Sequence, residues 1–129
     1  KDWEGFFGAI PEDHARWGVV GDVVHALPDG GEIILVSGRP DSYRAVTEKW
    51  LSDRGISVGG FWGTAWCTAL LMRHAGDRRD DTIVKRQILN THFPDRSVIH
   101  AVFDDRPRII RMWREAGLLV HDVGDGVEF

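Results

Sequence analysis

The chain has 129 residues, 43% of them apolar and 28% charged, with a formal net charge of -4. This length suits a single domain that buries its own core. The negative net charge argues against a broad electrostatic contact with duplex nucleic acid but leaves room for a local basic pocket that holds one phosphate. No apolar run approaches the roughly 20 residues of a membrane span, and no segment has the pattern of a secretory leader. Together with a single cysteine, Cys67, which we expect in the core, these features predict a cytoplasmic protein with no membrane partner.

Apolar runs alternate with stretches of helical period, an alternation typical of βα units with a largely parallel sheet. After an irregular, aromatic-rich start, the expected helices span residues 13–27, 41–54, 80–93 and 107–116. The expected strands span residues 32–36, 68–72, 98–103 and 118–121. No linker divides the chain, so we expect one α/β domain over residues 1–129.

The first polar cluster, Ser37-Gly38-Arg39, directly follows the expected strand 32–36. Ligands of open parallel sheets bind at the carboxyl ends of the strands. A hydroxyl, close backbone N–H groups and a guanidinium fork together suit a phosphate. The alternative is an ordinary strand-to-helix turn, in which the serine or Asp41 caps the next helix. The local pattern alone favours neither interpretation.

A second cluster, Asp104-Asp105, stands at the end of the apolar strand 98–103. Two adjacent carboxylates at a buried strand end repel each other and cost desolvation unless a cation lies beside them. Mg²⁺ binds carboxylate oxygens and keeps several waters. The pair is therefore a candidate metal site, and a solvated turn with one aspartate capping the next helix is the weaker alternative.

The third candidate is Lys85, in the first turns of the helix that follows a dense charged loop. A surface lysine paired with Asp81, four residues earlier, is the commoner outcome for such a residue. In the functional alternative, Asp81 orients Lys85 toward a phosphorylated carboxylate. Taken singly, the lysine favours the surface pair.

The order of the three clusters resembles motifs two, three and four of the haloacid dehalogenase superfamily, most closely the phosphatase half of polynucleotide kinase-phosphatases. The strings that carry the likeness are Val36-Ser37-Gly38-Arg39, the loop Arg73-His74-Ala75-Gly76-Asp77-Arg78-Arg79-Asp80-Asp81 leading to Lys85, and Asp104-Asp105-Arg106 with Met112-Trp113 in the next helix. The likeness covers nearly the whole chain, and the middle loop is its most specific part. It implies a three-layer, Rossmann-like parallel sheet and a phosphatase that uses Mg²⁺.

The resemblance also implies a role for each candidate residue. The expected catalytic residues are Ser37, Lys85 and Asp81, the expected phosphate- and substrate-binding residues are Ser37, Gly38, Arg39, Arg73 and Arg79, and the expected Mg²⁺ ligands are Asp104 and Asp105. Ser37 would hold the transferring phosphate with the backbone that follows it, and Lys85, oriented by Asp81, would neutralise a phospho-aspartate. The phosphate would come from a phosphorylated substrate, with DNA or RNA 3' ends as the first expectation.

One motif of the superfamily has no counterpart before Glu32: a strand ending Asp-x-Asp-x-Thr, which supplies the nucleophile and the general acid. The nearest string, His121-Asp122-Val123-Gly124-Asp125, spaces its aspartates by two residues, and we expect a terminal turn there. We therefore expect the first strand and the nucleophile upstream of Lys1, and no activity from these 129 residues alone.

Three hypotheses about function follow. The first is a polynucleotide 3'-phosphatase that trims DNA or RNA ends for repair. The second keeps the chemistry and changes the substrate to nucleotides or other small phosphorylated metabolites. The third is a non-catalytic module that binds a phosphate or a nucleic acid end. The arginine-rich loop, residues 73–79, favours the first hypothesis over the second, whereas the negative net charge favours the second slightly.

Overall fold

The structure is a computed structural model that describes Gly21, residues 32–63 and residues 65–129. The strands of that part are β1 (Glu32–Pro40), β2 (Gly60–Trp62), β3 (Ala65–Arg73), β4 (Val102–Asp104) and β5 (Val120–Asp122). The helices are α3 (Arg44–Ser52), α4 (Asp81–His92) and α5 (Pro107–Glu115), with the short 3-10 turns η1 (Asp41–Tyr43) and η2 (Arg96–Val98). The predicted helix 13–27 lies outside the described residues except for Gly21.

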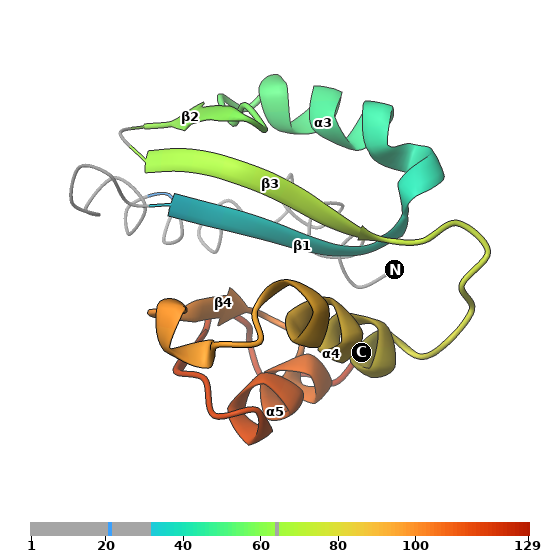
Figure 1. The fold of residues 1–129 in the computed structure, drawn as a ribbon, viewed down its shortest axis with the longest axis vertical. Coiled ribbons are helices and arrows are strands. Elements are labelled where there is room, and N and C mark those ends of the chain that lie inside the picture. Colours follow the sequence, from blue (N-terminus) through green and yellow to red (C-terminus); the bar gives the residue numbers. More distant parts are fainter. Residues whose placement is uncertain (1–20, 22–31, 64) are drawn as a thin grey trace.

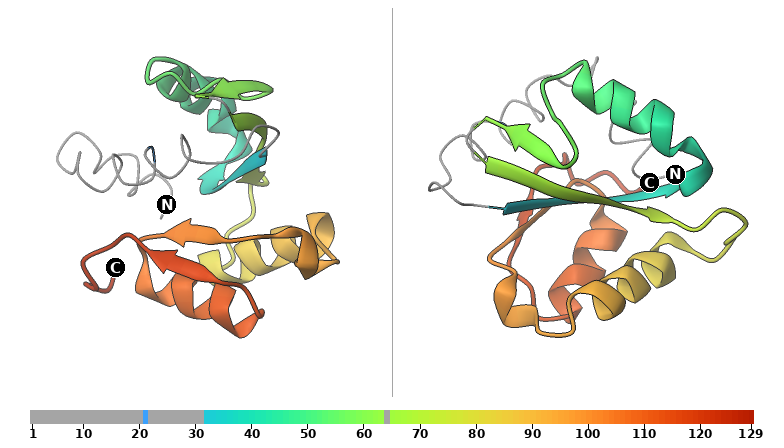
Figure 2. Two further views of the ribbon diagram at one scale, coloured as in Figure 1. Left: turned by 90° about the vertical axis from the view of Figure 1, so that its left-hand side faces the viewer. Right: turned by 45° about the horizontal axis from the view of Figure 1, so that its top comes forward.

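The described strands form two sheets. In the first, β3 lies between β1 and β2, parallel to β1 and antiparallel to β2 (Figure 2). In the second, β4 and β5 pair in parallel. The α/β class and the parallel pairing are confirmed, and β2, which the sequence did not predict, makes the first sheet mixed. The three-layer arrangement stays a prediction.

Helix α4 links the two sheets. Figure 1 shows the first sheet with α3 in the upper half of the view and β4 with α4 and α5 in the lower half, joined at the right by the loop from β3 to α4. Helix α4 packs against β1 and β3 and also against α5. The carboxyl ends of β1 and β3 therefore lie near the start of α4, where the predicted charged loop ends.

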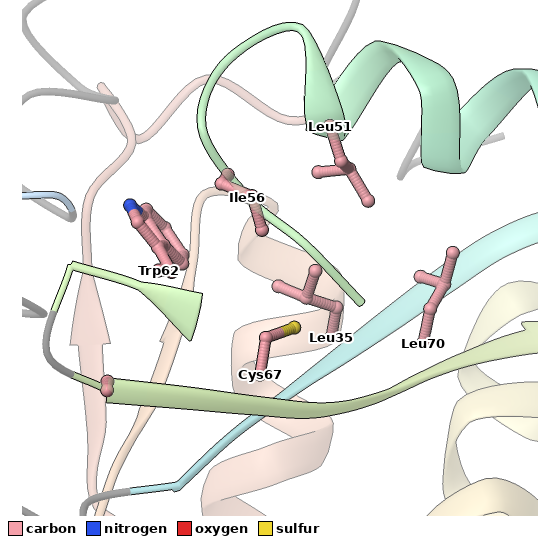
Figure 3. Packing of buried hydrophobic residues seen from close by; sticks show 7 residues of the cluster. Leu35, Leu51, Ile56, Trp62, Cys67 and Leu70 are labelled. Atoms are coloured by element: carbon pink, nitrogen blue, oxygen red, sulfur yellow. The ribbon is translucent and has the colours of Figure 1, made fainter. Parts of the chain in front are cut away.

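Two clusters of buried apolar side chains form the core. The first joins the sheet to α3 and the loop after it, and its members are Leu35, Leu51, Ile56, Trp62, Ala65, Cys67 and Leu70 (Figure 3). The second joins α4 and α5 to the second sheet, with Leu89, Ile109, Ile110, Met112, Trp113, Leu118 and Val120. The predicted core position of Cys67 is confirmed, and burial raises the pKa of its thiol to about 11.

The predicted strand 98–103 is wrong over most of its length. The Asp95 side chain accepts a hydrogen bond from Ser97 N at 3.0 Å and draws Arg96–Val98 into a 3-10 turn, so only Val102–Asp104 is a strand. Local capping by aspartate thus overrides the β preference of the valine and isoleucine. The predicted position of Asp104 at the carboxyl end of this strand is confirmed.

The other boundaries shift by a few residues. Strand β3 begins at Ala65, three residues before the prediction, and β5 begins at Val120, two residues after it. Asp41 does not cap the helix after β1 but accepts a hydrogen bond from Ala75 N at 3.0 Å, so it anchors the charged loop instead. The predicted helices 80–93 and 107–116 are confirmed as α4 and α5, with Pro107 at the first turn. Among the described residues, no helix has the length and apolar character to cross a membrane.

Candidate active site

Most buried polar side chains of the described residues are predicted site residues. Five polar or charged side chains are buried in this part of the chain, namely Ser37, Thr47, Asp81, Lys85 and Asp105, and none is more than 5% exposed. Four of the five were predicted from the sequence. Burial removes hydration from an ionised group and destabilises it unless it is paired. This concentration therefore marks the region of the fold where charge is held away from water.

Residues 37–40, the last of β1, depart from the regular register with β3, and we call them the β1 turn. This turn places a hydroxyl at the carboxyl end of the strand. Ser37 is fully buried, and its Oγ accepts a hydrogen bond from the backbone N–H of Arg39 at 3.0 Å. No described residue accepts a hydrogen bond from the Ser37 hydroxyl in return. The turn is thus fixed by its own serine, and the hydroxyl hydrogen can be donated to a ligand.

Arg39 is held by helix α3 and its preceding turn. Its Nη1 donates to Thr47 Oγ1 at 3.1 Å, and its guanidinium carbon lies 5.1 Å from the centre of the Tyr43 ring. Its buried Nε has no hydrogen-bond partner among the described residues. A buried guanidinium N–H without an acceptor is costly unless a ligand supplies one. Arg39 is therefore the arginine of this edge that is best prepared to bind an anion.

Arg73, the last residue of β3, is engaged by the protein itself. Its Nε donates to Gly38 O at 2.8 Å, and its Nη1 donates to the carbonyl oxygens of Asp77 and Arg79 at 3.1 and 2.7 Å. Its Nη2 donates to Oδ1 of Asp81. Four of the five N–H groups of a guanidinium are thus used to fix the charged loop and the β1 turn.

Arg79 is also paired within the charged loop. Its guanidinium forms a two-pronged contact with Asp77, with distances of 3.0 Å from Nε to Oδ1 and 2.7 Å from Nη2 to Oδ2, and Nη2 also donates to Gln87. Hydrogen bonds from this side chain hold the pKa of Asp77 well below its usual range and raise the pKa of Arg79. The side chain of Arg79 remains 48% exposed.

The start of α4 carries two adjacent aspartates with different tasks. Asp80 caps the helix, because its side chain accepts from the backbone N–H of Thr82 at 3.0 Å. Asp81 points inward, where Oδ1 accepts from Arg73 and Oδ2 accepts from Nη1 of Arg106 at 3.0 Å. Lys85, one turn further along the helix, is only 3% exposed. The surface pair expected for an ordinary lysine at this position is therefore wrong.

Asp104 and Asp105 differ in the same way at the end of β4. Asp104 Oδ1 accepts from the backbone N–H groups of Asp105 and Arg106 at 2.8 and 3.2 Å, and Oδ2 accepts from Trp113 Nε1 at 3.0 Å. Asp105 is 3% exposed, and a Cβ on Gly124 would lie 2.4 Å from its carbonyl oxygen. The close backbone approach of the chain after β5 thus closes the site behind Asp105.

The two carboxylates fit a divalent cation in part. Mg²⁺ in proteins is bound by one or two carboxylates and completes its shell with water and substrate oxygens. Asp104 and Asp105 supply oxygen donors of that kind at a strand end. In residues 32–63 and 65–129, no group of three or more histidine, cysteine, aspartate or glutamate side chains is arranged around one metal position.

The structure brings the three predicted motifs together at Asp81. A Cβ on Gly38 would lie only 2.6 Å from Oδ1 of Asp81, and Arg73 and Arg106 both bind its carboxylate. Gly38 and Arg106, which follow Ser37 and Asp105, therefore both lie beside Asp81, one helical turn before Lys85. Sequence reasoning gave no role to Arg106, although it follows the aspartate pair directly. It also missed Thr47, for which the sequence carries no signal.

Comparison with known proteins gives one family. The family described as the polynucleotide kinase PNKP phosphatase domain matches residues 7–128. A protein of Autographa californica nuclear polyhedrosis virus, described as "Putative bifunctional polynucleotide kinase/RNA ligase", is 27% identical over 116 residues, which cover 89% of this chain and 16% of that protein.

Solved structures agree with this match. A chain in the structure of the Pnkp1/Rnl/Hen1 RNA repair complex aligns with a TM-score of 0.67 and 30% identity, over 83% of this chain and 32% of that one. A chain from another structure of the Pnkp1/Rnl/Hen1 complex aligns with a TM-score of 0.62 and 32% identity, over 73% of this chain and 30% of that one. The chain thus spans about a sixth of the viral relative and about a third of the solved chains. With a family match over nearly its whole length and a site of the corresponding order, the chain belongs to the haloacid dehalogenase-type phosphatase domains of polynucleotide kinase-phosphatases.

Proposed function

We propose that the protein is an Mg²⁺-dependent phosphomonoesterase that removes the 3'-phosphate of polynucleotide ends through a phospho-aspartate. The observation that carries the proposal is the junction at Asp81, where the β1 turn, the end of β3, the start of α4 and Arg106, the residue after Asp105, meet. Four strand or helix ends converge there on buried polar side chains. Such an edge suits phosphoryl transfer, which depends mainly on positioning and charge stabilisation.

In this proposal the β1 turn and helix α4 bind the transferring phosphate. The hydroxyl of Ser37 donates to a phosphate oxygen, and Lys85 places a positive charge beside the phosphorylated carboxylate. The burial of both side chains supports this assignment, because their interactions with an anion are stronger away from water. The acceptor carboxylate itself is the part that these 129 residues do not supply, as no Asp-x-Asp string occurs among them.

Among the arginines, we assign the contact with the substrate phosphate to Arg39. Its unsatisfied Nε and its fixed position on Tyr43 and Thr47 prepare it for an anion. Arg73 and Arg79, which the sequence assigned to the same role, spend their donors on the protein. We therefore give them the task of shaping the loop that borders the site.

Asp105, with Asp104 beside it, is the proposed site of Mg²⁺. The bound ion would supply charge neutralisation for the phosphate oxygens. We propose that Asp105, the more deeply buried of the two, is the main ligand and that Asp104, whose oxygens accept three hydrogen bonds, also fixes the turn. The buried position of Asp105 supports this division, because a buried carboxylate benefits most from a cation.

For the substrate we propose RNA 3' ends before DNA 3' ends. The matched family is named for polynucleotide kinase, and one similar chain comes from the structure of an RNA repair complex. The aromatic ring of Tyr43, which is 52% exposed, lies beside the guanidinium of Arg39. Its exposed part offers a stacking surface to a base next to the scissile phosphate.

A second candidate, a phosphatase of nucleotides or other small phosphorylated metabolites, is favoured by one observation. The internal contacts of Arg73 and Arg79 leave less basic surface for the flanking phosphates of an oligonucleotide than the sequence indicates. An enzyme for small substrates needs no such surface. The two candidates differ in how the rate depends on substrate length and on salt.

Phosphate release by the complete protein tests both candidates. We expect 3'-phosphorylated RNA oligonucleotides to react at least tenfold faster than nucleoside monophosphates or sugar phosphates, and we expect this preference to fall as salt rises. Lys85→Met should abolish release, and Lys49→Met, which changes an exposed lysine on α3, should leave it unchanged. Equal rates on oligonucleotides and small substrates at all salt concentrations would favour the second candidate, and no release from any substrate would refute both.

A further inference from the structure

The two sheets of the described chain share no backbone hydrogen bonds with each other. The turn with Ser37 ends a strand of the first sheet, whereas Asp104 and Asp105 end a strand of the second. The proposed reaction needs both groups at a fixed separation, because one phosphate must touch both sides. Side-chain contacts that run between the two sheets therefore bear directly on that separation.

A pair of ion contacts at Asp81 crosses between the sheets. Arg73 is the last residue of β3, in the first sheet, and Arg106 lies two residues after β4, in the second. Nη2 of Arg73 binds Oδ1 of Asp81, and Nη1 of Arg106 binds Oδ2 at 3.0 Å. Asp81 sits at the first residue of α4, the helix that packs on both halves. We call these three residues the Arg73–Asp81–Arg106 bridge.

The bridge is buried and its charges depend on one another. The side chains of Arg73, Asp81 and Arg106 are 11%, 4% and 12% exposed. Two guanidiniums this poorly hydrated remain near each other because the carboxylate lies between them. Each guanidinium donates along fixed directions, so the bridge constrains geometry as well as charge.

The β1 turn also contacts the Asp81 carboxylate. Arg73 Nε donates to Gly38 O at 2.8 Å while its Nη2 binds Asp81. The space between Gly38 and Asp81 is too small for a side chain at position 38, because an added Cβ would lie 2.6 Å from Oδ1. A shift of Asp81 therefore moves the backbone beside Ser37, and a shift of Arg106 moves the backbone beside Asp105.

From these contacts, and resting on the proposed function, we infer that Asp81 is a positioning residue that ties the phosphate-binding turn of β1 to the aspartate pair. It acts through Arg73 toward Ser37 and through Arg106 toward Asp105. In this assignment, Arg73 and Arg106 align the site and do not bind the substrate themselves. Loss of the bridge impairs the reaction step more than it impairs substrate binding.

Kinetics of Arg106→Lys in the complete protein test the inference, with Arg108→Lys as a matched control. Both changes keep the positive charge and remove a guanidinium that binds an aspartate at the start of α4 at 3.0 Å, but the Arg108 contact is exposed. We expect Arg106→Lys to lower kcat per folded molecule about 100-fold, the effect of a misplacement of about 1 Å, with KM changed less than threefold. Arg108→Lys should change neither.

Gly38→Ala gives the same test without altering any charge. The added methyl displaces the Asp81 carboxylate, so we expect the same loss of kcat with little change of KM. A rise of KM at unchanged kcat in Arg106→Lys would overturn the inference, because it would assign the guanidinium to substrate binding. An unchanged kcat per folded molecule in both variants would overturn it as well.

A folding measurement keeps this inference separate from the proposed function. In urea unfolding, Arg73→Lys and Arg106→Lys should each lower the folding equilibrium constant, and the loss in the double variant should be at least tenfold smaller than the product of the single losses. Such coupling is expected because both side chains act on one carboxylate. Losses that multiply would overturn the bridge. If the wild-type protein releases no phosphate from any substrate, the proposed function fails while this folding cycle still decides the bridge.

Discussion

The chain contains two Asp-Asp pairs that precede a helix, Asp80-Asp81 before α4 and Asp104-Asp105 before α5, and they solve one electrostatic problem differently. In each pair the first aspartate binds backbone N–H groups of the turn, and the second is buried. Asp81 is neutralised by Arg73 and Arg106, from two different sheets. The Asp104-Asp105 pair lies side by side at a strand end, where a cation is the natural partner of two carboxylates.

This difference shows that a buried carboxylate is not evidence of catalysis by itself. One buried aspartate is matched with arginines and suits a structural task, whereas the other belongs to an acidic edge that suits a metal ion. Substitutions in and around the two pairs test this division, and the change at Asp105 has the largest expected effect.

Asp105→Asn should lower Mg²⁺-dependent phosphate release by about a thousandfold or more, because the amide keeps the volume and removes the charge that we propose to bind Mg²⁺. Asp104→Asn should cost less, since the oxygens of Asp104 already accept three hydrogen bonds. The measurement is kcat at increasing Mg²⁺ for both variants, with Asp53→Asn on the exposed end of α3 as the control. Near wild-type turnover of Asp105→Asn would assign the metal elsewhere.

Asp81→Asn should lower the free energy of unfolding by about 3–5 kcal/mol, the usual effect of removing one partner from a buried ion pair. It leaves two poorly hydrated guanidiniums without the charge between them. Asp105→Asn should destabilise less, because it also removes repulsion from the neighbouring Asp104. Urea unfolding at neutral pH without added Mg²⁺ compares the two directly, and equal losses would remove the distinction between the pairs.

Trp113→Phe should lower the free energy of unfolding by about 1–3 kcal/mol, because it removes the donor to Oδ2 of Asp104 from an indole that is only 5% exposed. The Mg²⁺ concentration for half-maximal activity should rise by a few fold as the turn loosens. Trp66→Phe is the control, since this tryptophan is 40% exposed and lies in the other sheet. An unaltered Mg²⁺ titration would show that Asp104 is held without Trp113.

Asp80→Asn should have the smallest effect, and it should depend on pH. Hydrogen bonds from Thr82 lower the pKa of Asp80 from 3.8, so its ionised form stabilises the folded state above that pH. The contribution is lost as pH falls through the folded-state pKa. We therefore expect Asp80→Asn to lower the free energy of unfolding by about 1 kcal/mol or less at pH 7, and we expect this difference to shrink as pH falls below 3.8. A constant difference across this range would contradict the assignment.

The features predicted best from the sequence are those that depend on residues close together along the chain. The starts of α4 and α5 follow from Asp80 as a cap and Pro107 in the first turn, and both are confirmed. The length of the strand before Asp104 was overestimated, because apolar residues at 98 and 99 do not reveal that Asp95 closes a 3-10 turn there. The short β2 was missed because the glycines and tryptophans of residues 59–66, around and within it, suggest a loop.

The positions of the site residues at strand and helix ends were predicted better than the partners of their side chains. The resemblance implied that Ser37, Lys85 and Asp105 share a site, and all three are buried at connected ends of strands and helices. The tasks of the arginines could not be predicted, since a guanidinium in a charged loop looks the same whether it binds a ligand or a backbone carbonyl. Only the three-dimensional contacts separate Arg39, with its unpartnered Nε, from Arg73, whose donors are engaged.

The buried thiol of Cys67 can report on transient openings of the first apolar cluster. Its Sγ lies in the apolar cluster between the first sheet and α3, and its pKa of about 11 keeps it protonated at neutral pH (Figure 3). A thiol-specific reagent can therefore react only during openings that expose the cluster and restore an ordinary thiolate. Because it is the one cysteine of the chain, the labelling rate at several reagent concentrations yields the opening frequency of the first sheet without any engineered probe.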